Sequence, residues 1–333
     1  MSMQTNGREI TMSQAINEAI CEEMRRDETV VLLGEDVGLP GGVFKVTQGI
    51  FNEFGPNRVF DTPISEAGIS GLGVGAAMTG LRPIIEIMFG DFMTLAMDQL
   101  VNQAAKVHYM SGGKIKVPIV IRTTLGAGRR TAAQHSQSLQ ALVSHIPGLK
   151  VVMPSTPYDA KGLLKTAIRD NNPVIFFEDK QMYSKKGLVP ESTEEYTIPF
   201  GSADVKRSGT DITFIATSSM VHVALDAATK LAETGIEAEV IDPRTLTPLD
   251  EDALVNSVKK TSRSIIIDEG CQRYGVTAEI ASVVAEQAFY YLDAPVWRLG
   301  AMNVPVPFSP ILEDQTIPTV EILVEAARQL LLP

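Results

Sequence analysis

The chain has 333 residues, which is long for one domain because a single hydrophobic core stops growing at about 250 to 300 residues. Acidic residues outnumber basic ones by 40 to 29, so the average surface repels nucleic acid and anionic membranes. No apolar run reaches the roughly 18 to 20 residues that span a bilayer. The N-terminal stretch MSMQTNGREITMSQ is polar, so we expect a cytoplasmic protein. Two cysteines in unrelated contexts argue against disulfide, zinc or redox chemistry.

Short β-rich runs alternate with longer helical segments in the first half of the chain. The β-rich runs are apolar throughout, which is typical of a parallel sheet covered on both faces. The predicted strands are Thr29–Asp36, Arg82–Met88, Lys116–Thr124, Leu149–Pro154 and Asn172–Asp179, and the predicted helices are Ile10–Asp27, Ala67–Thr79, Thr94–Met110 and Pro157–Asp170. Pro157 suits a first helical turn, because its missing N–H costs nothing there.

A polar stretch from Met182 to Asp211 lacks a periodic signal and contains Gly, Pro and Ser. Beyond it the alternation resumes, with strands in ITFIATSS, IEAEVIDPRTL, SRSIIIDEG and APVWRLG and helices near Val221–Gly235, Asp250–Lys260, Gly275–Tyr291 and Thr319–Leu331. The sequence therefore predicts an α/β protein of two domains in series, each a mostly parallel sheet flanked by helices. We place the first domain at residues 1–185, a linker at 186–210 and the second domain at 211–333.

The stretch GLGVGA, Gly71–Ala76, matches the dinucleotide-binding fingerprint, and Glu86 closes the next strand where a ribose-binding acid could lie. An NAD-dependent oxidoreductase is therefore one alternative. The fingerprint requires its first glycine at a tight strand-to-helix turn, whereas ten residues separate Gly71 from the short strand RVF. The other explanation is a helix whose small residues let a neighbouring backbone approach closely. These residues are Gly68, Gly71, Gly75, Ala76 and Gly80.

One acidic residue, Glu66, leads this small and apolar segment, and no basic residue follows it until Arg82. As an exposed acid at a helix N-terminus it would contribute roughly 0.3 to 1 kcal/mol through the helix dipole. The apolar residues on both sides instead suggest burial, and a buried carboxyl has a raised pKa that suits proton transfer near neutral pH. The residues themselves leave both explanations open.

Several long motifs follow one another in the chain: DTPISEAG, GAAMTGLRPIIEIMFGDF, MDQLVNQAAKVHYMSGG, AAQHSQS, IPGLKVVMPSTPYDAKGLLKTAIRDNNPV and DPRTLTPLD. Together they resemble the β subunit of the thiamine-diphosphate-dependent first component of 2-oxo acid and acetoin dehydrogenase complexes. The resemblance covers nearly the whole chain. It implies a transketolase-like pyrimidine-binding domain followed by a transketolase C-terminal domain.

The resemblance also implies roles for four residues of the first domain. Glu66 is similar to the acid that hydrogen-bonds N1′ of the cofactor's aminopyrimidine, with Ile64 and Phe92 as further cofactor contacts. A buried core phenylalanine is the alternative for Phe92. His135, in AAQHSQS, is similar to an active-site imidazole that helps pass the acyl group to a lipoyl arm, although a histidine in a polar loop is usually solvated. Imidazole titrates near neutral pH and suits this role.

The resemblance further implies a monovalent cation, potassium, held by four residues: Ile119, Ala167, Asp170 and Asn172. Carbonyl and carboxylate oxygens at a helix C-terminus suit a hard cation, and capping by asparagine is the alternative. Family members bind Mg²⁺ and the cofactor's diphosphate with a GDG motif and a later asparagine motif. The nearest match here is GDF at Gly90–Phe92, without the second half. An α subunit is therefore expected to hold the diphosphate and Mg²⁺.

These implications predict a β subunit in a heterotetramer of two α and two β subunits, docked to a lipoyl acyltransferase core. The enzyme would cleave a C–C bond next to a carbonyl and pass the acyl group to lipoyl. Acetoin, pyruvate and branched-chain 2-oxo acids are the candidate substrates, and the motifs are closest to the acetoin branch. The alternatives are the NAD-dependent oxidoreductase above and a non-catalytic interaction subunit.

Overall fold

The computed structural model describes residues 7–191 and 195–332. Residues 1–6 of the polar N-terminal stretch, 192–194 of the predicted linker and residue 333 lie outside the described residues. By their contacts the residues form two units, the first containing Met1–Leu125 and Leu142–Phe200 and the second containing Gly126–Ala141 and Gly201–Pro333. The segment Gly126–Ala141, which carries His135, is thus grouped with the second unit although it interrupts the first in sequence.

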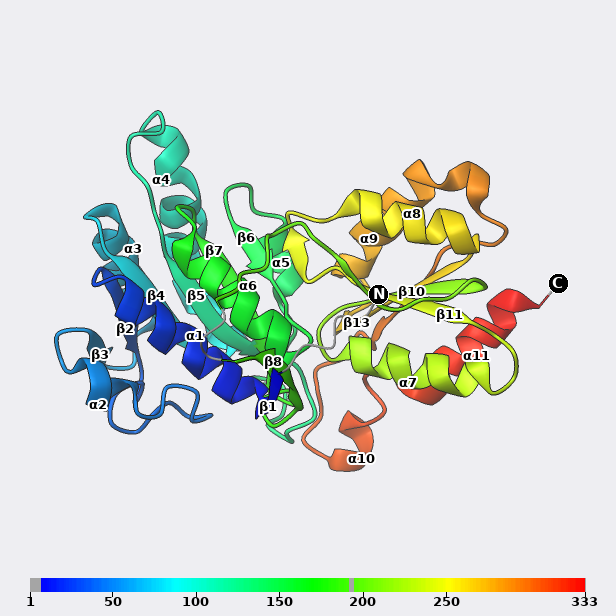
Figure 1. The fold of residues 1–333 in the computed structure, drawn as a ribbon, viewed down its shortest axis with the longest axis horizontal. Helices are drawn as coiled ribbons and strands as arrows, with labels where there is room; N and C mark the ends of the chain where they lie inside the picture. The colour runs from blue at the N-terminus through cyan, green and yellow to red at the C-terminus, as the bar shows by residue number, and fades with distance from the viewer. Residues whose placement is uncertain (1–6, 192–194, 333) are drawn as a thin grey trace. The chain divides into compact units, whose positions relative to one another are not determined.

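The first unit is built on a sheet whose neighbouring strands run parallel in the order β6-β7-β5-β4-β2-β3 (Figure 1). The strands are β2 (Val30–Gly34), β3 (Val59–Asp61), β4 (Arg82–Ile87), β5 (Val120–Leu125), β6 (Lys150–Val152) and β7 (Val174–Asp179). All five predicted strands are confirmed. Every residue of β2, β5 and β7 is buried, which explains why these segments are rich in apolar residues.

Helices of the first unit mostly begin where local sequence predicts them. They are α1 (Met12–Arg26), α2 (Ile50–Phe54), α3 (Glu66–Met78), α4 (Ala105–Met110) and α6 (Pro157–Arg169), and the short α5 (Gln140–Ser144) spans the division between the units. Thr11 and Gln14 form a capping box at the start of α1. Thr156 accepts a hydrogen bond from Asp159 N at 3.1 Å, with Pro157 in the first turn of α6, as predicted.

The prediction of one continuous helix over Thr94–Met110 is wrong. A 3₁₀-helix over Gly90–Ala96 and a π-helix over Gln99–Ala104 precede the short α4. A Cβ at Gly90 would lie 2.4 Å from the Thr124 carbonyl oxygen, so the chain enters this segment pressed against β5. Helical periodicity does not distinguish these helix types, and π-helical turns are frequent at functional sites.

Two strands lie in or next to the stretch predicted as linker. β1 (Gly7–Thr11) pairs antiparallel with β8 (Lys186–Pro190), and β9 (Asp204–Arg207) pairs antiparallel with β11 (Ala238–Asp242). Both pairings are non-local edge contacts, which a scan for buried apolar runs does not detect. The stretch predicted as a linker, residues 186–210, therefore contains two strands, β8 and β9.

The second unit contains a sheet in the order β14-β13-β10-β11-β9, parallel except for the edge strand β9. Its remaining elements are β10 (Ile212–Ala216), β12 (Thr245–Thr247), β13 (Ser264–Cys271), β14 (Trp297–Ala301), α7 (Met220–Ala232), α8 (Glu251–Thr261), α9 (Val276–Gln287), a 3₁₀-helix at Phe289–Tyr291, α10 (Pro310–Glu313) and α11 (Val320–Leu331). One core cluster joins the sheet to α7 and α11, and another joins it to α8 and α9. Helices therefore cover both faces, and the predicted fold class is confirmed.

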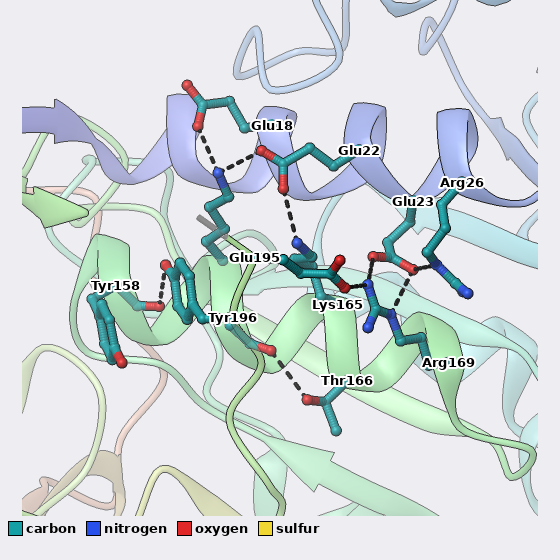
Figure 2. A network of polar contacts seen from close by, with 12 residues as sticks. Glu18, Glu22, Glu23, Arg26, Tyr158, Lys165, Thr166, Arg169, Glu195 and Tyr196 are labelled. Carbon is teal, nitrogen blue, oxygen red and sulfur yellow. Dashed lines mark hydrogen bonds and ion pairs between the residues drawn. The ribbon is translucent and has the colours of Figure 1, made fainter. Parts of the chain in front are cut away.

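A network of ion pairs joins α1 to α6, which lie side by side in Figure 1 and are enlarged in Figure 2. Lys161 Nζ lies 3.0 Å from Glu18 Oε2 and 2.6 Å from Glu22 Oε1. One turn further, Lys165 Nζ lies 2.9 Å from Glu22 Oε2, and Arg169 binds both oxygens of Glu23. The side chains of Lys161 and Lys165 are only 1% and 3% exposed, so these two cations of the network are shielded from solvent.

None of the helices in the described parts of the chain is long and apolar enough to cross a membrane.

Loss of the Lys161 ammonium should destabilise the first unit. Because two carboxylates each lose a charge-assisted hydrogen bond, we expect Lys161→Met to lower the free energy of unfolding by about 1 to 3 kcal/mol. Lys186 pairs with Glu9 at 3.8 Å, and both side chains are more than half exposed. Lys186→Met, the matched control, should change stability by at most about 0.5 kcal/mol. Urea unfolding followed by circular dichroism measures both, and equal losses would show that burial of the α1–α6 network adds nothing.

Candidate active site

Glu66 is the first residue of α3, directly after the N-cap Ser65, whose hydroxyl accepts a hydrogen bond from Gly68 N at 3.2 Å. The glutamate is 8% exposed. It is thus a first-turn acid, where the helix dipole favours negative charge, and at the same time a buried carboxyl. The explanation that made Glu66 an exposed helix-end acid is wrong, and burial is confirmed.

Glu35 is a second acid close enough to Glu66 for the two charges to interact. It was not identified from the sequence. It follows β2 directly, and its Oε1 is buried with no hydrogen-bond partner among the described residues. Burial raises the pKa of Glu35, and the charges of Glu66 and Asp36 raise it further. Its position at the carboxyl end of a parallel strand is where ligand sites of open α/β sheets lie, and that signal was present in the sequence.

Glu35 can therefore hold a proton at a pH where an isolated glutamate would have lost it, because burial and the neighbouring charge of Glu66 both disfavour its ionised form. An orphaned buried oxygen beside a buried acid also offers hydrogen bonds to a ligand that carries both donors and acceptors. An aminopyrimidine ring has such groups, so the residues present fit the ring that the sequence motifs imply.

A row of aromatic rings lies in the same unit. The Phe92 ring lies edge-on to Phe89 at 6.0 Å between centroids, Phe89 contacts Phe44 at 5.7 Å, and Phe44 stacks on Tyr183 at 5.2 Å. Phe92 is half-buried, so it is neither a fully buried core residue nor a free surface side chain. Ile64 differs from it, because its side chain is 82% exposed and is available to contact a ligand or another chain.

A buried ion triad connects strands β4, β5 and β7 and contacts this row through Tyr183. Arg122 donates to Glu86 Oε2 at 2.6 Å and to both oxygens of Glu178 at 2.7 and 2.8 Å. Tyr183 adds a hydrogen bond to Glu178 at 2.7 Å. Burial alone would lower the pKa of Arg122, but Glu178 and Glu86 raise it above its ordinary value. Burial raises the pKa of Glu86, partly offset by Arg122.

The triad and the course of α3 contradict the dinucleotide alternative. Glu86, the proposed ribose-binding acid, is bound to Arg122 inside the protein. Gly71–Ala76 lies within α3, which begins five residues earlier at Glu66, so no glycine stands at the strand-to-helix turn that the fingerprint requires.

The small residues of α3 were expected to let a neighbouring backbone approach closely. Within this chain that expectation is wrong, because a Cβ on Gly75 or Gly80 would meet nothing within 4 Å. Gly73, which the expectation omitted, is the tight position: a Cβ there would lie 2.9 Å from the side chains of Ile85 and Ile119. Gly68, Leu72 and Gly75 are exposed on the opposite side of the helix.

His135 lies in the segment Gly126–Ala141 of the second unit and is half-buried. Its N–H bonds to the Ala132 carbonyl at 3.4 Å, and its carbonyl accepts from the Thr131 hydroxyl at 3.0 Å. Gly126, Gly128, Arg130 and Ala132 all have positive φ, so the segment is a sharply folded loop and not an extended one.

The four residues predicted to hold potassium have contacts within the protein. The Ile119 carbonyl accepts from Val174 N at 2.9 Å, and the Ala167 carbonyl accepts from Asp170 N at 3.2 Å. The Asp170 carboxylate pairs with Lys150 and accepts two hydrogen bonds from Asn172 at 2.9 Å.

Lys150 and Arg82 bind the C-terminal end of α6. Burial works to raise the pKa of Asp170, but Lys150 and Asn172 lower it below its ordinary value. Arg82 donates to the Ile168 and Asp170 carbonyls at 3.0 and 2.9 Å, complementing the helix C-terminus. Asp170 itself is the C-cap, so capping by asparagine is wrong. Potassium binding stays a prediction. Across residues 7–191 and 195–332, no group of three or more His, Cys, Asp or Glu side chains is arranged to hold a metal ion.

Comparison with known proteins places these features in a family. Residues 8–186 match the family described as transketolase, pyrimidine binding domain, and residues 201–323 match transketolase, C-terminal domain. A solved structure described as split gene transketolase, inactive beta4 tetramer, superposes with a TM-score of 0.76 at 26% identity and covers 97% of this chain and 98% of its own.

Three curated relatives are similar over nearly their whole length. The acetoin:2,6-dichlorophenolindophenol oxidoreductase subunit beta of Bacillus subtilis is 56% identical, covering 97% of this chain and 98% of the relative. Pyruvate dehydrogenase E1 component subunit beta of Rickettsia felis is 50% identical, covering 96% and 98%. The 2-oxoisovalerate dehydrogenase subunit beta of B. subtilis is 48% identical, covering 90% and 91%.

The chain therefore belongs to the transketolase family, whose members depend on thiamine diphosphate, and it contains both the pyrimidine-binding and the C-terminal domain. Its relatives are β subunits of the first components of acetoin and 2-oxo acid dehydrogenase complexes, which confirms the resemblance seen in the motifs.

Proposed function

We propose that this chain is the catalytic β subunit of an acetoin- or 2-oxo-acid-cleaving enzyme that passes the acyl group to lipoyl. The single observation that carries the proposal is the buried Glu66 at the start of α3, next to Glu35, in a pyrimidine-binding domain of the transketolase family. Acetoin is the favoured substrate, because the relative with 56% identity is an acetoin oxidoreductase subunit.

Thiamine diphosphate, when bound, supplies the carbon nucleophile and the electron sink for cleaving a C–C bond next to a carbonyl. Glu66 would hold and release a proton at its carboxyl oxygen, facing the pyrimidine ring. Glu35, whose pKa is raised by burial and by the charge of Glu66, would carry a proton of its own beside Glu66. Phe92 and the exposed Ile64 would pack against the ring and exclude water from it.

The other half of the cofactor site is proposed to belong to an α subunit. This chain has GDF at Gly90–Phe92 in place of a complete diphosphate and Mg²⁺ motif, and in the structure this segment is a 3₁₀-helix that packs on β5. The relatives are named as β subunits, which implies an α partner. We propose two α and two β subunits, with a lipoyl acyltransferase core as the acyl acceptor.

The chain alone should bind thiamine diphosphate weakly, because a diphosphate needs a metal and a cradle of donors that its partner supplies. Isothermal titration of the purified chain with cofactor and Mg²⁺ measures this, and addition of the α subunit should restore tight binding. Tight Mg²⁺-dependent binding to the lone chain would contradict the division of the site between two subunits.

Replacement of Glu66 by Gln should leave assembly and cofactor binding intact but lower turnover by about 10²- to 10⁴-fold, the usual cost of losing an acid–base group. The measurements are dye-linked turnover and hydrogen–deuterium exchange at C2 of the bound cofactor at matched occupancy. Glu28→Gln, at an exposed acid, is the control. Unchanged exchange and turnover in Glu66→Gln would instead favour a non-catalytic interaction subunit.

Replacement of His135 by Ala should separate two activities. Because the imidazole is assigned to acyl transfer, reductive acylation of a lipoyl domain should fall by about 10²-fold or more while dye-linked turnover is partly retained. The neighbouring Gln134 is exposed, and Gln134→Ala should leave both rates unchanged. Equal losses of the two activities in His135→Ala would remove the assigned role.

A further inference from the structure

The loop Gly126–Ala141 is held at both ends, and again at Gly128 and Arg130, by carboxylates of the second unit. At its start, Ala127 N donates to Glu269 Oε1 at 2.5 Å, and Ser219 Oγ bonds the other oxygen of Glu269 at 3.1 Å. At its end, Gln140 Nε2 donates to Asp268 Oδ2 at 2.7 Å. These two acids are adjacent residues of β13, so one strand fixes the separation of the two loop ends.

The residues that follow the start of the loop are held by Glu313, the last residue of α10. Gly128 N donates to Glu313 Oε1 at 2.7 Å, and Arg130 Nη1 donates to Glu313 Oε2 at 2.7 Å. The Glu313 side chain is fully buried, whereas the Arg130 side chain is 36% exposed. A buried carboxylate is costly unless it is paired and hydrogen-bonded, and here each of its two oxygens receives a bond from the loop.

These hydrogen bonds lie in the part of the loop whose backbone has positive φ angles, and they stabilise that conformation. Gly128 has φ 86°, and Arg130 and Ala132 have φ 58° and 60°, in a region that residues with a Cβ rarely adopt. The Ala132 carbonyl then accepts the His135 N–H, and the Thr131 hydroxyl bonds the His135 carbonyl. A short series of contacts thus leads from Glu313 through Arg130 to the backbone of His135.

We propose that Glu313 is a positioning residue for His135, acting through Arg130 and Gly128. This inference rests on the proposed function, since it assigns His135 to acyl transfer. The same contacts distinguish the two adjacent arginines of the loop: Arg130 is paired with Glu313 and with Asp314 at 2.7 Å, whereas Arg129 is exposed. Two carboxylates thus hold the guanidinium of Arg130 against α10, so its position is tied to that of Glu313.

Glu313→Gln in the enzyme assembled with its α subunit tests this role. Glutamine keeps an oxygen for Gly128 N but loses the charge that holds Arg130. We expect reductive acylation of a lipoyl domain to fall about 10-fold, because a catalytic group displaced by about 1 Å can cost up to 10²-fold. Dye-linked turnover should change less than about 2-fold, since that rate is expected to depend less on His135 than acyl transfer does. Asp314→Asn removes an acid that binds the same guanidinium but is 62% exposed, and it should change neither rate.

The decisive measurement combines Glu313→Gln with His135→Ala. If Glu313 acts by placing the imidazole, the double variant should acylate no more slowly than His135→Ala alone, because the group being positioned is already absent. A further tenfold loss in that background would overturn the proposal, since Glu313 would then act by another route.

A second readout does not depend on catalysis. Amide hydrogen exchange of peptides covering residues 126–141 should be faster in Glu313→Gln than in Asp314→Asn, because the clamp on Gly128 and Arg130 is weakened. Unchanged exchange would overturn the positioning role even if His135 is essential. A normal acylation rate in His135→Ala, by contrast, would refute the proposed role of His135, and faster loop exchange in Glu313→Gln would still show that the clamp exists.

Discussion

The cost of burying a carboxylate is the constraint on which both units depend. An ionised acid out of water is tolerated when it has a cation or several hydrogen bonds. In the first unit, Arg122 satisfies Glu86 and Glu178 together and so ties β4 and β7 to the strand between them. In the second unit, Asp268, Glu269 and Glu313 each accept at least one hydrogen bond from the same loop. Where acids are satisfied by other segments, they determine which segments lie together.

Glu35 is a buried acid without such a partner for one of its oxygens, and it belongs to the candidate active site. One of its oxygens is buried without a hydrogen-bond partner among the described residues, and the nearby charge that most affects it is Glu66, another acid. Burial and the charge of Glu66 favour a bound proton on Glu35, whereas at Glu86 the effect of burial is partly offset by the cation of Arg122. The aromatic row that ends at Phe92 and the exposed Ile64 provide apolar contacts in the same unit. The first unit thus combines an acid with a raised pKa, Glu35, with exposed apolar side chains, which suits a pyrimidine-binding domain.

Local sequence was sufficient for the regular elements, because their signals are local. Apolar runs identified the buried strands, and residues such as Thr156 and Pro157 identified helix starts. It failed where the outcome depends on a distant neighbour. The helix predicted over Thr94–Met110 is divided into three types, with its entry at Gly90 pressed against β5. The strand β8 is defined by its pairing with β1, which lies nearly the whole first unit away in sequence.

The candidate site divides in the same way. By itself the sequence determined the fold class, the helix that begins at Glu66, and the motifs that identify Glu66, Phe92 and His135, because each depends on residues adjacent in the chain. Tertiary structure alone decided that Glu66 is buried, that Glu35 lies near it, and that Glu86 forms an ion pair with Arg122. It also decided that the His135 loop is clamped by acids more than a hundred residues further along the chain, such as Glu269 and Glu313. Burial and ion pairing depend on which distant segments meet, and no local pattern encodes that meeting.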